Sequence, residues 1–243
     1  MEREIPVGSG PVWEEALLAW DQRLDTAQAQ RAVQRFEDIA RRESKNPDAW
    51  AWCARARFYL GDYEADEGKR RDFFEQGMKL GRRGIDLDGK HVPALFWTSV
   101  CEASYVELVG LLRRATYLPE ILGFMKLVWQ LDPGYYHHGA ARLLGQALVR
   151  QPGLVRRFLP LAMPEMSPEV VIREMRQAIA DGPPVVLTHQ TLAQVLHATK
   201  GDRAIVREQL KVIGSLDLDA DSNFAPENRR DQPRAAKLLK ALA

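Results

Sequence analysis

The sequence predicts an all-α chain of about ten helices. Through most of the 243 residues, apolar side chains recur three and four positions apart, which is the spacing that places them on one face of a helix. Short apolar runs of the kind that form strands are few, and PVVL at 184–187 is an example. Turn-forming residues interrupt the helical pattern repeatedly, so we expect successive helices joined by short turns.

The helix boundaries are expected at these turn-forming residues, taken in order along the chain. Proline and glycine disfavour a continuing helix, while asparagine and aspartate favour caps and turns. Such residues stand at Asn46-Pro47, Gly61-Asp62, Asp88-Gly89, Asp132-Pro133, Gln151–Gly153, Asp181–Pro184, Gly201-Asp202 and Asp217–Pro226. We expect residues 1–12 to be a flexible N-terminal segment and residues 1–243 to form a single domain.

Internal repeats become visible when these turns are aligned. The segments 39–50, 84–97 and 128–140 each run from an apolar helix end through an Asp/Pro/Gly turn into a new helix, and 178–193 is close to the same pattern. A single helical pair cannot bury its apolar face alone, whereas stacked pairs can. The repeats therefore predict a tetratricopeptide-like superhelix of antiparallel helix pairs.

Three glycines in one expected helix predict an unusually close contact between helices. Gly77, Gly81 and Gly84 are spaced four and three residues apart and so share one face. Each costs a helix about 1 kcal/mol relative to alanine. Their presence on one face indicates that neighbouring helices approach the backbone there.

Composition excludes several function classes. The formal net charge is +1, which argues against a chain devoted to nucleic acid or to an acidic membrane surface. No run reaches the length of a membrane span, and MEREIPVGSGPVW lacks the apolar core of a signal peptide. A cytoplasmic location is expected, with a periplasmic one as the alternative if a leader was removed. Cys53 and Cys101 are expected to be buried free thiols.

Motifs that resemble known chemical sites are better explained as turns between helices. The segment 84–91 falls one residue short of a phosphate-binding loop and follows a helix rather than a strand. The segment 217–228 has calcium-like aspartates but lacks the glycine and the final glutamate that calcium loops need. The histidines show no HExxH spacing, and no CxxC or Ser/His/Asp arrangement is present. We therefore expect no catalytic residue, metal or cofactor.

Aromatic residues near similar positions of successive helical pairs are the candidate ligand-binding residues. Aromatics at helical spacing usually pack in a core. Adjacent ones point to different faces, however, so one member of each pair is expected to line a groove or channel. For each residue, core packing and ligand contact remain open alternatives. The candidates, with neighbouring polar residues, are Trp50, Trp52, Tyr59, Trp97, Tyr105, Tyr135, Tyr136, His137, His138 and Arg142.

Four stretches carry a family resemblance: 47–64 (PDAWAWCARARFYLGDYE), 81–100 (GRRGIDLDGKHVPALFWTSV), 131–153 (LDPGYYHHGAARLLGQALVRQPG) and 201–242, which contains a late Pro-Glu-Asn. In this order they resemble the T component (TatT-type) family of TRAP transporters, irregular tetratricopeptide-like proteins. The resemblance covers roughly residues 25–243. The segment 157–171 departs from the pattern, because the family has a glycine-rich turn there.

The resemblance implies a non-enzymatic protein that partners the substrate-binding protein of a TRAP transporter. It also implies a small apolar or acidic ligand in an internal channel, with Arg142 able to pair with a carboxylate, and a homo-oligomer such as a trimer. The alternative is a generic cytoplasmic tetratricopeptide scaffold that binds a peptide or protein partner without a link to transport.

Overall fold

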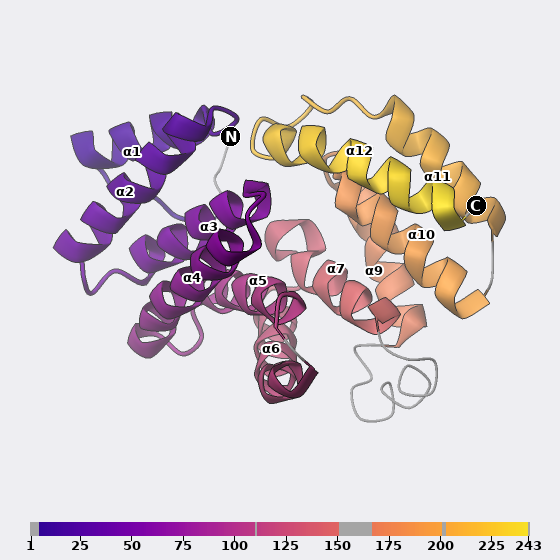
Figure 1. Ribbon diagram of the computed structural model, residues 1–243, viewed down its shortest axis with the longest axis horizontal. Helices are drawn as coiled ribbons and strands as arrows, with labels where there is room; N and C mark the ends of the chain where they lie inside the picture. The colour runs from indigo at the N-terminus through magenta and orange to yellow at the C-terminus, as the bar shows by residue number, and fades with distance from the viewer. Residues whose placement is uncertain (1–4, 110, 151–166, 201–202, 243) are drawn as a thin grey trace. The chain divides into compact units, whose positions relative to one another are not determined.

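The computed structural model describes residues 5–109, 111–150, 167–200 and 203–242. Eleven helices and no strands are found within those residues, which confirms the all-α prediction. The chain divides into two compact units, Met1–Asp132 and Pro133–Ala243 (Figure 1). That residues 1–243 act as a single domain stays a prediction.

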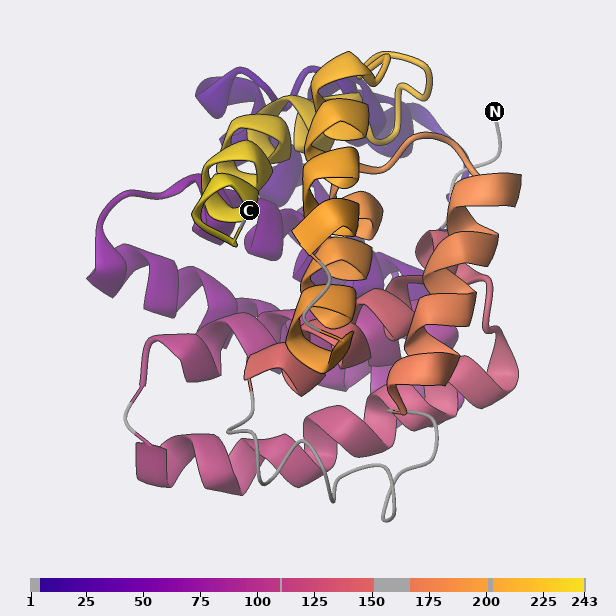
Figure 2. The same cartoon turned by 90° about the vertical axis from the view of Figure 1, so that its right-hand side faces the viewer.

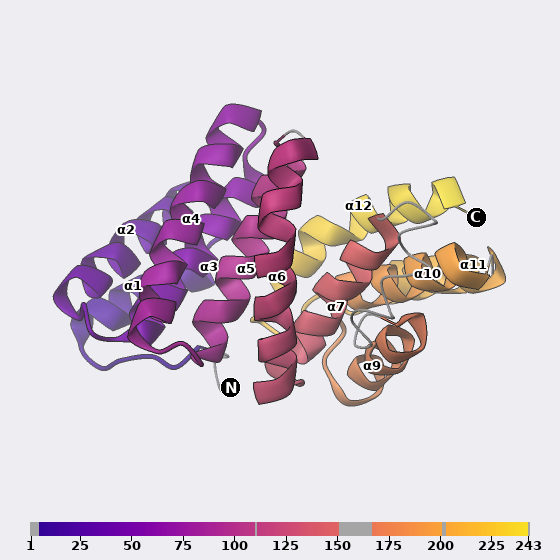
Figure 3. The ribbon, with the colours of Figure 1, turned by 90° about the horizontal axis from the view of Figure 1, so that it is seen from below.

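The first unit is a series of helices in which each packs against the next one in sequence. Short turns join most of them, so neighbours pair in an antiparallel manner. Helix α5 lies against α3 and α4 on one side and α6 on the other (Figure 3). The helices are α1 (Pro11–Asp21), α2 (Thr26–Arg42), α3 (Pro47–Tyr63), α4 (Glu67–Leu87), α5 (Val92–Glu107) and α6 (Leu111–Leu131).

The second unit is organised around α10. Helices α7, α9, α11 and α12 all contact it (Figure 2), and its core joins Val186 and Ala193 of α10 to Val206, Ile213 and Leu239. The described helices are α7 (Tyr135–Arg150), α9 (Pro168–Asp181), α10 (Val186–Lys200), α11 (Arg203–Ser215) and α12 (Ala225–Leu242).

Polar residues at the expected turns cap the helices that follow them. The Asn46 side chain accepts a hydrogen bond from the Asp48 amide at the start of α3, with Pro47 in the first turn. His91 caps α5 by accepting from the Ala94 amide, and its Nε2 lies 2.9 Å from the Asp48 carboxylate. The histidine that seemed to belong to a phosphate-like loop is thus part of a helix start.

The glycine face of α4 makes the close contact that its spacing predicts. A β-carbon on Gly77 would stand 2.6 Å from Cys101 Sγ of α5, and one on Gly84 would stand 2.9 Å from Ala94 Cβ. Real β-carbons essentially never come so near, so α4 and α5 could not pack this way with larger residues. The prediction from the glycine pattern is confirmed.

Arg82 joins the three helices α4, α5 and α6 through two ion pairs, one of them with a buried carboxylate. Arg82 of α4 donates to Glu102, whose side chain is fully buried in α5, and also to Glu120 of α6 at 2.7 Å. The pKa of Glu102 is raised to about 7, mainly because the carboxyl is buried; Arg82 opposes this rise, and Glu120 adds to it. One carboxyl in the core of this unit therefore titrates near neutral pH.

The first twelve residues include described contacts. Ile5 is buried, the Pro6 carbonyl accepts a hydrogen bond from Trp52 Nε1 at 3.2 Å, and α1 begins at Pro11. Flexibility of residues 1–12 stays a prediction, and residues 1–4 lie outside those described. So do residues 151–153 and most of 157–171.

Two further expectations from the sequence concern membrane spans and the thiols. Of the helices described, none is long and apolar enough to cross a membrane. Cys53 and Cys101 are free and buried, as predicted.

Candidate functional site

The five aromatic candidates of the first unit are all buried. Trp52 is fully buried and stacks on Phe36, with ring centroids 4.7 Å apart and planes 13° apart. The other four have 5% or less of their surface exposed, and they are Trp50, Tyr59, Trp97 and Tyr105. Core packing accounts for each of these positions. Ligand binding by them stays a prediction.

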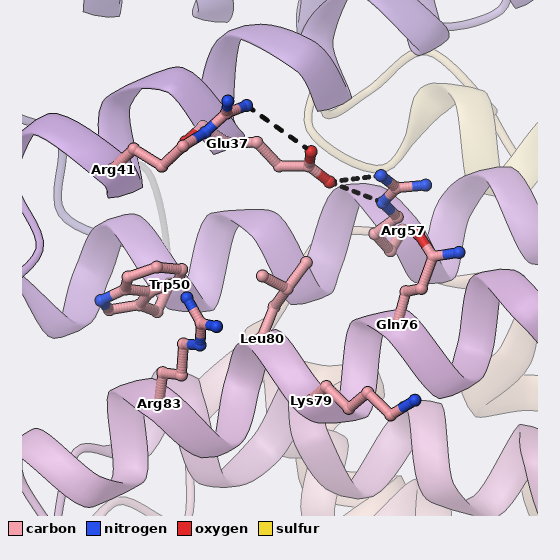
Figure 4. A pocket seen from close by; sticks show the side chains of 8 residues that line it. All are labelled: Glu37, Arg41, Trp50, Arg57, Gln76, Lys79, Leu80 and Arg83. Carbon is pink, nitrogen blue, oxygen red and sulfur yellow. Dashed lines mark hydrogen bonds and ion pairs between the residues drawn. The ribbon is translucent and has the colours of Figure 1, made fainter.

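Trp50 also lines a cavity. The cavity has a volume of about 290 Å³ and is formed by α2, α3 and α4, which all belong to the first unit (Figure 4). Trp50 and Trp52, two positions apart on α3, thus have different surroundings. The lining residues are Glu37, Arg41, Trp50, Arg57, Gln76, Lys79, Leu80 and Arg83.

Helix α4 contributes four of these residues as one stripe. Gln76, Lys79, Leu80 and Arg83 are spaced so that the last three follow the first by three, four and seven positions, which places all four on one helical face. The glycine face begins one residue later, at Gly77, and packs against α3 and α5. Because the glycine face is buried, the helix is held with the polar stripe turned to the cavity.

The cavity is strongly cationic. Its lining contains two arginines from α2 and α3, a lysine and an arginine from α4, and a single carboxylate, Glu37. Arg57 donates to Glu37 through Nε at 2.8 Å and through a second nitrogen, and Arg41 approaches the other oxygen at 3.9 Å. Glu37 is therefore engaged by the two arginines nearest to it (Figure 4).

The two cations of α4 are less constrained. Lys79 pairs with Glu75 on its own helix at 2.7 Å, although 68% of the Lys79 side chain is exposed. Arg83 is exposed and lies over the Trp50 ring, with the guanidinium carbon 4.9 Å from the ring centroid. Trp50 is itself held, since its Nε1 donates to the Ser44 carbonyl at 3.0 Å. The described residues provide no carboxylate partner for Arg83.

The candidates of the second unit form a left-handed turn at the start of α7. Tyr136, His137 and His138 have φ angles of 51°, 47° and 58°, so three consecutive residues that are not glycine occupy the left-handed region. This conformation costs roughly 1–2 kcal/mol for each residue with a side chain. The sequence predicts a new helix after the turn at Asp132-Pro133, but it gives no sign of this left-handed first turn.

Arg142 stabilises this turn from within the unit. Its guanidinium donates to the Tyr136 carbonyl at 2.6 Å and to the His137 carbonyl, and it lies over the Tyr136 ring. Arg142 is 5% exposed. The cation expected to meet a ligand carboxylate is thus bonded to carbonyls of its own chain, and a ligand role for it stays a prediction.

The two histidines and Tyr135 also have structural contacts. Burial first, and then the charge of Arg142, lower the pKa of His137, whose ring packs 4.9 Å from that of Phe224. His138 Nδ1 lies 3.0 Å from Glu174, and Tyr135 is buried. Across the described part of the chain, no three His, Cys, Asp or Glu side chains are grouped to hold a metal ion.

The cationic lining was missed by reasoning from the sequence. Arg41 and Arg83 each stand beside a second arginine, a pattern that is typical of a solvated helix face or a helix end. The signal available was the 76, 79, 80 and 83 spacing beside the glycine face, but which other helix faced that stripe was unknown. Helix pairing supplies Glu37 and Arg57 from regions far away in sequence.

Comparison with known proteins identifies the fold. No family model matches the chain, and no curated protein matches it. Among solved structures, TTC0263, described as a thermophilic TPR protein in Thermus thermophilus, is similar with a TM-score of 0.57 and 17% identity. The match covers 93% of this chain and 98% of that one. The chain therefore has a tetratricopeptide-like all-α fold.

Proposed function

We propose that the chain is a non-enzymatic scaffold that binds a protein partner through the cavity between α2, α3 and α4. The observation that carries this proposal is the stripe of Gln76, Lys79, Leu80 and Arg83 on α4, which lines the cavity together with Trp50. The glycine-bearing face of α4 is buried and holds the helix in place. Binding surfaces with rigid support lose little conformational freedom when they are occupied.

The chemistry of the lining supports binding over catalysis. It contains arginines, a lysine, a glutamine and one glutamate that is already paired, together with Trp50 and Leu80. Covalent catalysis usually requires a nucleophile such as serine, threonine or cysteine next to a base. The eight lining residues include no serine, threonine, cysteine or histidine.

Site-specific photo-crosslinking tests the proposal. A photoreactive amino acid at Gln76, which is exposed and lines the cavity, is expected to crosslink one protein partner in cells that produce the full chain. The same amino acid at Arg71 is the control, because Arg71 is exposed on α4, does not line the cavity and stands five positions before Gln76, on another face of the helix. Equal crosslinking from both positions, or none from Gln76, would contradict the proposal.

A more specific candidate is the T component of a TRAP transporter, with the transporter's substrate-binding protein as the partner. The order of the four resembling stretches, from 47–64 to 201–242, favours it. A small apolar or acidic ligand, a trimeric assembly and a periplasmic location belong to this candidate. The generic scaffold, expected in the cytoplasm, needs none of them.

Gene neighbourhood and native mass spectrometry separate these two candidates. Genes for a TRAP permease beside this one, a bound ligand and a trimer mass would support the T component. A ligand-free monomer whose gene has no such neighbours would leave the generic scaffold, and cell fractionation would report the compartment.

A further inference from the structure

The cavity of the first unit has a charge that limits what can occupy it. It holds four cationic side chains and one carboxylate, and that carboxylate is bonded to Arg57 and approached by Arg41. An occupant with carboxylates would meet Arg83 and Lys79, whereas a cationic occupant would be repelled. From this geometry we propose that the cavity binds an acidic segment of a protein partner through aspartate or glutamate side chains. This proposal rests on the proposed function, because it assumes that the cavity is the binding site for a protein.

Arg83 is the principal contact in this proposal. Its guanidinium lies over Trp50, which the bond to the Ser44 carbonyl keeps in place. Stacking leaves the edge of the guanidinium, where its N–H groups point, available to a carboxylate. A planar fork of N–H groups suits the two oxygens of a carboxylate. The described part of the chain supplies no carboxylate to Arg83, so a partner's carboxylate would displace no internal ion pair there.

Lys79 supplies a second contact, for which it has to exchange a weak surface ion pair. Its pair with Glu75 joins two partly exposed side chains on one helix, at 68% and 42% exposure. Such exposed pairs contribute little to stability, so Lys79 can exchange Glu75 for a partner's carboxylate. Lys79 and Arg83 are four residues apart on α4, about one turn of helix, so two acidic side chains of one segment can reach both.

The size of the cavity favours side chains of a longer segment over a separate small ligand. Its volume of about 290 Å³ lies just below the roughly 300–1,000 Å³ of pockets that hold drug-sized molecules. The apolar part of the lining, Trp50 and Leu80, can contact the methylene groups of a glutamate. Aspartate and glutamate combine a carboxylate for the cations with methylene groups for Trp50 and Leu80 in one side chain.

Fluorescence anisotropy with the full chain tests the proposal. The probe is a fluorescein-labelled hexaglutamate peptide, with a labelled hexalysine peptide as the charge control. Arg83→Gln is expected to weaken hexaglutamate binding by about tenfold, which corresponds to the loss of one charge-assisted hydrogen bond pair. Arg71→Gln removes the same charge from an exposed site of α4 outside the cavity and is expected to change binding less than about twofold.

The outcomes are distinct. The proposal is overturned if hexaglutamate does not bind, if Arg83→Gln and Arg71→Gln weaken binding equally, or if vesicles of phosphatidylserine compete for the same site more strongly than the peptide. A crosslinked partner at Gln76 without peptide binding would leave the scaffold proposal standing and remove the acidic segment. Peptide binding without a crosslinked partner would instead count against the scaffold role in cells.

Discussion

Gly81 of α4 faces Thr98 of α5 so closely that a β-carbon on the glycine would stand 2.2 Å from the threonine hydroxyl oxygen. The same β-carbon would be 3.2 Å from Ala54 Cβ of α3. Three helices therefore meet at one residue without a side chain. The stability of the first unit depends on this contact.

Gly81→Ala is expected to destabilise the protein, although alanine is the better helix former. Overpacking of a tight interface typically costs about 1–3 kcal/mol of stability. Because Thr98 is so close, we expect this cost to exceed the gain of about 1 kcal/mol in helix propensity that alanine brings. Gly123→Ala in α6 is the matched control, because among the described residues no atom outside its own stretch of helix lies within 4 Å of its would-be β-carbon. The control is expected to stabilise the protein. Urea unfolding of both variants measures whether each change raises or lowers the free energy of unfolding. A higher free energy of unfolding for Gly81→Ala would contradict the close contact between α4 and α5.

The raised pKa of Glu102 predicts a stability that falls as pH rises. Its pKa is about 7 in the folded chain and near 4.5 without the fold, so between these values the folded state retains a proton that the unfolded state has lost. The stabilising contribution is complete below the unfolded value and is lost as pH rises through about 7. Integrated over the shift, the effect is at most about 3 kcal/mol.

Glu102→Gln tests this pH dependence. The variant cannot ionise, so the difference in unfolding free energy between it and the parent chain should change with pH from 4.5 to about 7 and level off above. Asp72→Asn, an exposed amide replacement on α4, is the control. A difference that stays constant across this window would show that Glu102 does not titrate there.

Replacing Arg142 should loosen the second unit. Arg142→Met keeps much of the length of the side chain but removes the donors to the Tyr136 and His137 carbonyls. Leaving buried acceptors without a charged donor costs on the order of 2–4 kcal/mol. Arg176→Met on the exposed face of α9 is the control and should change stability by less than about 0.5 kcal/mol. Hydrogen exchange should show the loss within residues 133–242, and protection equal to that of the control would exclude the stabilising role.

Asn228 connects the start of α12 to the turn before α10. Its amide nitrogen donates to the Pro184 carbonyl at 2.7 Å, and its oxygen accepts from the Val186 amide at 3.0 Å. Asn228→Asp preserves the shape and the acceptor but places a carboxylate oxygen against a carbonyl, for a loss of about 1–3 kcal/mol. Thermal unfolding of this variant can be compared with Gln30→Glu, the same chemical change at an exposed site of α2. If the two variants had equal melting temperatures, the two hydrogen bonds of the Asn228 side chain would not stabilise the protein.

Local patterns in the sequence predicted the helices and the glycine contact, because both depend on spacing within one helix. Gly77, Gly81 and Gly84 show this well: spacing reveals their shared face, and the structure shows α3 and α5 against it. The cationic cavity could not be predicted in this way. Its residues run from Glu37 to Arg83 on three helices, and each charged one resembles an ordinary solvated charge.

The left-handed turn of Tyr136, His137 and His138 was missed for a related reason. Left-handed backbone is usually marked by glycine, and none stands at these positions. The turn is held instead by Arg142, a residue from the following helical turn. A bond of this kind depends on the three-dimensional position of one guanidinium, which periodicity does not encode.

Because the chain's two cysteines are buried, their reaction with an alkylating reagent can report local opening of the native protein. Cys53 and Cys101 both belong to the first unit, and burial is the main reason that the pKa of each thiol is raised. The thiolate is the reactive form, and burial disfavours it as well as excluding the reagent. Alkylation of the native chain therefore requires opening of the first unit. Opening of residues 133–243 exposes no thiol. The rate of thiol labelling under native conditions therefore measures the opening of one unit alone, without any substitution.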